Sequence, residues 1–206
     1  MITVIDDFMP EEYFRQLQTF LLSSSFPWFY SHNISTGMKK PAGMKNAIDS
    51  SAFAHKVFGK WENQKSLAYE AFLPLVDKIE NHLENTHELI RLRAVLTNYQ
   101  HGFASYNYNL PHVDYPCPHI SAVYYLNETD GDTWIFDQYY QGKIDPETYT
   151  VKQRINPIPN RLLIFDGLQY HTASNPIMHN NRLIANLNFM QKGTDLEQER
   201  LKYINS

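Results

Sequence analysis

The sequence L-P-H-V-D-Y, which runs from Leu110 to Tyr115, places a histidine and an aspartate two positions apart. Side chains on a β-strand alternate between its two faces, so on a strand His112 and Asp114 would point the same way. An imidazole beside a carboxylate supplies two of the three ligands of a 2-His-1-carboxylate site, which suits non-haem Fe(II) with open coordination positions. A lone His-x-Asp pair also occurs on ordinary solvated strands, so the interpretation depends on a third ligand elsewhere in the chain.

Two downstream segments supply the missing groups. Y-H-T-A-S-N-P at 170–176 contains His171, and N-R-L-I-A-N-L-N-F at 181–189 contains Arg182, eleven positions later. Two antiparallel strands joined across the Asn-Pro turn can place both side chains on one interior face. A guanidinium offers a carboxylate the fork geometry that lysine lacks. Taken alone, His171 would be a core histidine and Arg182 a strand-edge charge; together they predict a metal site with a carboxylate clamp.

Length and composition indicate the broad class. A chain of 206 residues suits one domain with a substantial core. The formal net charge of −4 provides no overall basic field, so we expect neither a membrane surface nor nucleic acid as partner. The single cysteine, Cys117, permits no internal disulfide and fits a reducing compartment, from which we expect a cytoplasmic protein. We see no signal peptide and no apolar run of the roughly 18 residues that a membrane span needs.

Apolar periodicity predicts helices at 10–22 and 67–83, the second with Pro74 near its start. After residue 85 the pattern becomes that of short strands separated by turn signals, which is typical of a sandwich or barrel. We expect these strands at 91–99, 119–127, 133–138, 148–155, 161–165, 170–173 and 183–190, with further short ones at 2–6 and 28–30. The predicted fold is mainly β with flanking α. A jelly-roll core at 91–190 follows an N-terminal helical and loop region at 1–90, and a tail at 191–206 completes the single domain 1–206.

Residues 31–51 have little periodicity and contain Lys39, Lys40 and Lys45. Loops of this length inside a domain are often binding loops. We interpret the stretch as a candidate lid that orders over ligand, with an ordinary surface excursion as the alternative.

The order of several blocks resembles the Fe(II)/2-oxoglutarate-dependent dioxygenases, and in particular their prolyl-hydroxylase-like branch. The blocks are N-Y-Q (98–100), H-V-D (112–114), Y-Y-L-N (124–127), G-D-T-W-I-F (131–136), R-L-L-I-F (161–165), Y-H-T-A-S-N-P (170–176) and R-L-I-A-N-L-N-F (182–189). The resemblance covers residues 91–190, about half of the chain. One departure is Gly131-Asp132, where that family commonly has two glycines.

The resemblance implies a double-stranded β-helix, a cupin-like form of the jelly roll, and a role for each matching residue. His112, Asp114 and His171 take the iron positions, Arg182 takes the position that pairs with the distal carboxylate of 2-oxoglutarate, and Tyr99 and Tyr125 fall where co-substrate-contacting tyrosines occur. His101 and His119 lie near these positions in the sequence, and we expect structural roles for both.

The implied reaction uses Fe(II), 2-oxoglutarate and dioxygen, with ascorbate as a candidate reductant. It hydroxylates a C–H bond of a protein side chain, possibly prolyl, or of a small molecule, and releases succinate and carbon dioxide. Two alternatives stay open: a non-catalytic jelly-roll module that binds a metal or a 2-oxo acid, and a cupin-type metalloenzyme that uses no 2-oxo acid. Arg182 favours the oxygenase, because a cupin isomerase needs no distal carboxylate clamp.

Overall fold

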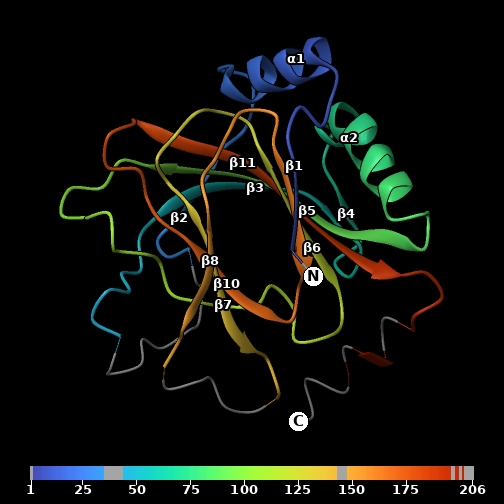
Figure 1. Ribbon diagram of the computed structural model, residues 1–206. Helices are drawn as coiled ribbons and strands as arrows, with labels where there is room; N and C mark the ends of the chain where they lie inside the picture. The colour runs from blue at the N-terminus through green and yellow to red at the C-terminus, as the bar shows by residue number, and fades with distance from the viewer. Residues whose placement is uncertain (1, 35–43, 143–147, 196–197, 200, 202–206) are drawn as a thin grey trace.

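The computed structural model describes residues 2–34, 44–142, 148–195, 198–199 and 201 (Figure 1). The described residues form the helices α1 (Glu11–Leu22) and α2 (Tyr69–His82) and eleven strands. The strands are β1 (Ile2–Ile5), β2 (Phe29–Ser31), β3 (Ala52–Gly59), β4 (Gln64–Lys65), β5 (His87–Asn98), β6 (Ile120–Tyr125), β7 (Thr133–Tyr139), β8 (Val151–Ile155), β9 (Leu162–Asp166), β10 (Gln169–Ala173) and β11 (Asn181–Gln191).

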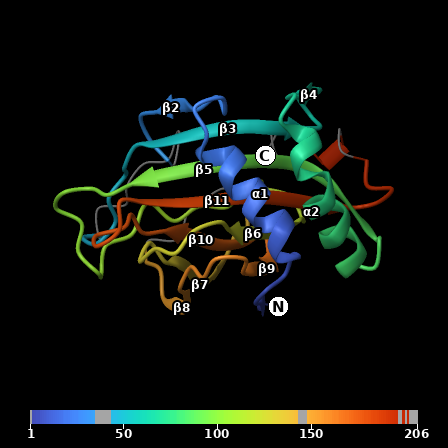
Figure 2. The same cartoon turned by 90° about the horizontal axis from the view of Figure 1, so that it is seen from above.

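The strands make two sheets. The larger sheet has eight strands in the order β1-β9-β6-β11-β5-β3-β2, with β4 paired to β3, and the smaller has the order β10-β7-β8. Neighbouring strands are antiparallel in both sheets. Figures 1 and 2 show the helices on one side of the larger sheet and β7, β8 and β10 on the other. This is the double-stranded β-helix with outer helices that the sequence predicted.

Strand β5 illustrates why the larger sheet has two apolar faces. Leu92 and Ala94 belong to the core beneath the helices, whereas Val95 belongs to the cluster between the sheets, and Thr97 lines a cavity there. Side chains alternate along a strand, so one sequence can supply both layers. Strand β5 therefore contributes to both the outer core and the cavity between the sheets.

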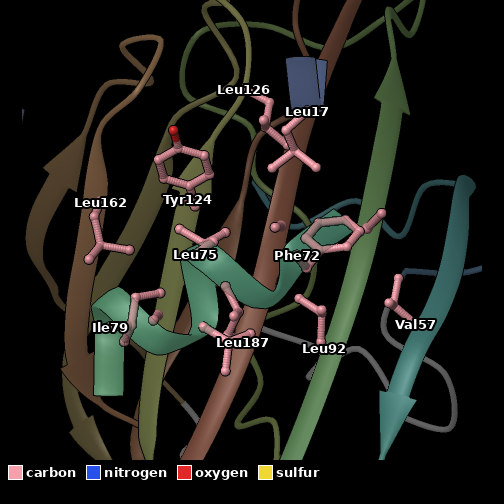
Figure 3. Packing of buried hydrophobic residues seen from close by; sticks show 14 of the residues in the cluster. Leu17, Val57, Phe72, Leu75, Ile79, Leu92, Tyr124, Leu126, Leu162 and Leu187 are labelled. Atoms are coloured by element: carbon pink, nitrogen blue, oxygen red, sulfur yellow. The ribbon is translucent and has the colours of Figure 1, made fainter. Parts of the chain in front are cut away.

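The two helices cover the outer face through regularly spaced apolar residues. Phe72, Leu75 and Ile79 of α2 point at the sheet, where Figure 3 shows them beside Leu92 and Leu187. Each such side chain removed from water stabilises the fold by about 1.5–3 kcal/mol. Both predicted helices are confirmed to within two residues at each end. No described helix is long and apolar enough to cross a membrane.

The structure departs from the predicted boundaries in the N-terminal region. Strand β3 was not predicted, yet it pairs with β5 over most of its length. Strands β1 and β2 confirm the short strands expected at 2–6 and 28–30, and β1 to β4 all join the larger sheet. The core also extends beyond 91–190, because β5 begins at His87 and β11 ends at Gln191. The physical reason is that β1 and β3 pair with β9 and β5, whose backbone groups would otherwise be unpaired at the edges of the sheet.

Candidate active site

A single bridge between two chain segments brings the two candidate histidine ligands together. The His112 N–H donates to the His171 carbonyl at 2.9 Å, and the His171 N–H donates to the His112 carbonyl at 3.0 Å. Directly opposed residues of an antiparallel pair project to the same face. The two imidazole ring centroids accordingly lie 4.8 Å apart. Beyond this isolated bridge residues 110–115 have no regular pairing, so the bridge and not a strand orients the segment.

Each imidazole is held by a hydrogen bond that leaves its outer nitrogen available. His112 Nδ1 lies 3.1 Å from the Leu110 carbonyl oxygen, and His171 Nδ1 lies 3.0 Å from the Gln169 carbonyl oxygen. A carbonyl only accepts, so each Nδ1 carries the proton and each Nε2 keeps its lone pair. Metal-ligating histidines are commonly oriented by such a second hydrogen bond.

Asp114 completes the candidate metal centre. One potential ligand atom from each of His112, Asp114 and His171 lies within 4.8 Å of the other two. The Asp114 Oδ2 atom lies 3.7 Å from His171 Nε2 and accepts a hydrogen bond from Asn188 Nδ2 at 2.9 Å. Two neutral imidazoles and a carboxylate form a donor set that suits Fe(II), so these residues fit the metal.

The local electrostatics keep His112 and Asp114 in the protonation states that a metal requires. Burial, and then the neighbouring His171, lowers the pKa of His112 to about 4. Burial would raise the pKa of the Asp114 carboxyl, but the Arg91 guanidinium and His171 outweigh burial and hold that pKa well below its usual range. Arg91 Nη2 pairs directly with Asp114 Oδ1 in the protein interior. Metal binding at neutral pH therefore requires no proton to leave His112 or Asp114.

Arg182 lines the same cavity, at the end away from the candidate metal ligands. Its Nε donates to the Gly131 carbonyl at 2.7 Å and its Nη2 donates to Thr133 Oγ1 at 2.9 Å, while the side chain is 2% exposed. A Cβ at position 131 would lie 2.8 Å from Arg182 Cδ and 2.8 Å from the Ser174 carbonyl oxygen. Position 131 therefore requires glycine, because a Cβ there would collide with the Arg182 side chain. Asp132, which stands where the resembling family commonly has a second glycine, pairs with Arg154.

The cavity itself has a volume of about 260 Å³. Its lining includes the three candidate metal ligands and Arg182, together with the apolar side chains Val95, Val123 and Ile184. Three buried polar atoms of lining residues have no hydrogen-bond partner among the described residues. They are Thr97 Oγ1, Asn186 Oδ1 and Arg93 Nε. Buried polar atoms are nearly always paired, so these three indicate a polar ligand.

The two predicted tyrosine contacts have different outcomes. Tyr125 is fully buried behind the cavity wall, where its hydroxyl donates to Thr133 Oγ1 at 2.6 Å and the Arg182 guanidinium lies 5.7 Å from its ring centre. Tyr125 can therefore position the Arg182 guanidinium. Tyr99 does not line the cavity: its side chain is 52% exposed, and it borders a separate surface depression together with His101. Tyr99 directly follows β5, which ends at Asn98, and its exposed side chain lies outside the cavity.

The remaining predicted positions are also accounted for. His119 is buried outside the cavity, with Nδ1 bonded to the Cys117 carbonyl oxygen at 2.7 Å, which supports the expected structural role. Of the candidate lid at 31–51, residues 35–43, including Lys39 and Lys40, lie outside the described residues. Lys45 is exposed, and Ile34 is the part of the stretch that lines the cavity.

Sequence reasoning missed several polar residues of this site, namely Arg91, Arg93, Thr97, Thr133, Asn186 and Asn188. Five of these six lie on β5 and β11, where they face the smaller sheet. The signal that could have found them is the alternation of polar residues with apolar ones in R-L-R-A-V-L-T (91–97) and R-L-I-A-N-L-N (182–188). Polar groups on a strand that is buried on both faces are costly unless they are used.

No protein-family model and no curated protein matches this chain. Solved structures do resemble it. A prolyl hydroxylase from Trichoplax adhaerens, in complex with a peptide of the hypoxia inducible factor oxygen degradation domain, has a TM-score of 0.63 and 15% identity over 98% of this chain and 86% of that chain. A 2OG-Fe(II) oxygenase family oxidoreductase from Burkholderia pseudomallei has a TM-score of 0.60 and 10% identity over 91% and 84%. The α-ketoglutarate-dependent epimerase SnoN from nogalamycin biosynthesis has a TM-score of 0.59 and 11% identity over 92% and 78%.

These comparisons establish the fold. The chain adopts the double-stranded β-helix of the Fe(II)/2-oxoglutarate oxygenases, in the arrangement found in prolyl hydroxylases. The epimerase shares the same architecture, so the fold alone does not decide the reaction. The reaction therefore depends on the residues that line the cavity.

Proposed function

We propose that this protein is an Fe(II)- and 2-oxoglutarate-dependent oxygenase that hydroxylates a C–H bond of a protein side chain or small molecule, with release of succinate and carbon dioxide. One observation carries the proposal: the candidate ligands His112, Asp114 and His171 share a small buried cavity with Arg182. When bound there, Fe(II) would supply the oxidative chemistry with 2-oxoglutarate and dioxygen. The protein then contributes placement, charge and exclusion of water.

At one end of the cavity, the protein holds the ligand set in a fixed orientation. The backbone bridge sets the spacing of the two imidazoles, and their Nδ1 hydrogen bonds set the ring planes. Arg91 and Asn188 fix the Asp114 carboxylate and keep it ionised. Outer contacts of this kind typically change metal affinity by 10- to 100-fold when they are removed.

At the other end, Arg182 would bind the distal carboxylate of 2-oxoglutarate. Thr133 Oγ1 already accepts hydrogen bonds from Arg182 and Tyr125, so its own proton is free to point to a carboxylate oxygen. Thr97 is the cross-strand partner of Arg182, and its unpartnered hydroxyl can donate to the same group. Between the two ends, Val95, Val123 and Ile184 provide a dry wall.

The alternatives are weaker on the same observations. A non-catalytic module that binds only a metal or only a 2-oxo acid would need one end of the cavity, whereas the cavity holds both the complete ligand set and Arg182. A cupin-type metalloenzyme that uses no 2-oxo acid leaves unexplained a buried guanidinium with no carboxylate partner among the described residues.

The test is succinate formation from 2-oxoglutarate in the presence of Fe(II), ascorbate and air. Mass spectrometry of added peptides and amino acids would show which of them gains an oxygen atom. His171→Ala should abolish succinate formation, whereas His179→Ala serves as a matched control, because His179 lies apart from the cavity and pairs with Asp130. If the wild type formed no succinate under any of these conditions, the proposal would be wrong.

A further inference from the structure

A second cavity, of about 590 Å³, adjoins the one that holds the candidate metal ligands. It lies over β2 and β3, and the residues Ile34, Arg93 and Val95 line both cavities. Phe29 and Tyr30 of β2 border it with side chains that are 60% and 56% exposed. Exposed aromatic residues beside a groove indicate a place where a further molecule binds. Arg93 lies at the junction of the two spaces.

Arg93 differs from the other basic residues of these cavities. Arg91 pairs with Asp114, Lys56 pairs with Glu62 at 2.8 Å, and Arg182 donates to Gly131 and Thr133. Arg93 has no ion pair or hydrogen bond to any described residue, and its Nε is fully buried. Burial lowers the pKa of Arg93 to about 10, so the guanidinium is charged at neutral pH. A partly buried cation without a partner requires an anion to offset its desolvation.

Asn186 presents a complementary group directly across from it. The register of β11 and β5 places Asn186 opposite Arg93. Asn186 Nδ2 faces the Asp114 carboxylate at 3.4 Å; because a carboxylate only accepts, this fixes the amide orientation. The other amide atom, Oδ1, is therefore an acceptor, and it is buried without a partner among the described residues. The wall thus offers a charged donor and a neutral acceptor on neighbouring strands.

We propose that Arg93 and Asn186 bind the primary substrate, and that this substrate is a free amino acid. Its carboxylate would pair with the Arg93 guanidinium, and its adjacent N–H would donate to Asn186 Oδ1. A guanidinium matches a planar carboxylate through two parallel hydrogen bonds. This inference rests on the proposed function and narrows its substrate, because an internal residue of a peptide has no free α-carboxylate beside its N–H for Arg93 and Asn186 to bind together.

Calorimetric binding tests the inference without turnover. Wild-type protein is loaded with Zn(II) and 2-oxoglutarate, then titrated with each common free amino acid, with the amide of any that binds, and with the matching acid that lacks the amino group. We expect at least one amino acid to bind, and its amide to bind at least about tenfold more weakly, which corresponds to the loss of one charged contact. The acid without an amino group should also bind more weakly. Arg93→Met should reduce the affinity for the amino acid to that for the amide.

Lys56→Met is the matched control, since Lys56 lines the second cavity but pairs with Glu62. It should leave the preference for the acid over the amide unchanged. Arg93→Lys keeps the charge and should retain the preference at reduced affinity, so it carries the test if Arg93→Met does not fold. The inference is wrong if no amino acid binds the wild type, if the amide binds equally well, or if the preference survives in Arg93→Met.

The binding of 2-oxoglutarate separates this inference from the proposed function. Wild type and Arg93→Met should bind 2-oxoglutarate equally. If Arg93→Met weakens 2-oxoglutarate as much as the amino acid, then Arg93 serves the co-substrate and the inference fails. If the wild type does not bind 2-oxoglutarate at all, the proposed function fails, and the same titrations on the metal-loaded protein still decide the role of Arg93.

Discussion

Arg182→Met should weaken the binding of 2-oxoglutarate while it leaves the stability of the ligand-free protein nearly unchanged. The Arg182 guanidinium is a buried charge whose described hydrogen bonds go to two neutral oxygens, at Gly131 and Thr133. Burying a charge without a counter-ion costs several kcal/mol, whereas the lost hydrogen bonds contribute about 1–3 kcal/mol each. These terms largely offset each other when methionine fills the same space. We expect the free energy of unfolding of the ligand-free protein to change by less than about 2 kcal/mol.

Binding should respond very differently. A charge-assisted contact to a carboxylate is worth about 1.5–3 kcal/mol, so the dissociation constant for 2-oxoglutarate should rise about 10- to 150-fold. Calorimetric titration of the Zn(II)-loaded protein measures this constant, and urea unfolding measures stability. Arg161→Met is the control, because Arg161 pairs with Asp6 at 2.6 Å away from the cavity. An unchanged 2-oxoglutarate affinity in Arg182→Met, together with a large loss of stability, would show that Arg182 is a structural residue.

Three further outcomes are expected. His112→Ala and Asp114→Ala should each abolish tight Fe(II) binding in anaerobic titrations, because two ligands cannot hold this ion facially; unchanged affinity in both variants would remove the metal assignment. Gly131→Ala should weaken 2-oxoglutarate while sparing the metal, because the new Cβ would lie 2.8 Å from Arg182 Cδ; equal affinities in variant and wild type would contradict that close packing. The buried His119 should make the free energy of unfolding depend on pH, because burial lowers the pKa of this histidine to about 4. Between about pH 6.5 and pH 4 the unfolded state binds the extra proton, so stability should decline as the pH falls, by up to about 3 kcal/mol; a His119→Asn variant with the same pH profile as the wild type would refute this.

The sequence alone determined the features that depend on local pattern. Apolar residues at helical spacing defined α1 and α2, and alternation in residues 91–97 defined the two faces of β5. The spacing of His112, Asp114, His171 and Arg182 predicted a metal site with a clamp, and the fold brings all four to one cavity. These signals are readable because helix and strand periods act over a few neighbouring residues.

Only the tertiary structure decided which distant groups meet. A backbone bridge between His112 and His171, and not a regular strand at 110–115, sets the geometry of the two imidazoles. Tyr125 packs behind Arg182 whereas Tyr99 is exposed, although one is the last residue of a strand and the other directly follows a strand. Asp114 forms an ion pair with Arg91 of β5. The pairing of β5 with β11 fixes the position of Arg91 in the larger sheet. Strand order and register arise from contacts between residues far apart in the chain, so no local pattern could have shown that Arg91 pairs with Asp114 while Arg93 has no partner among the described residues.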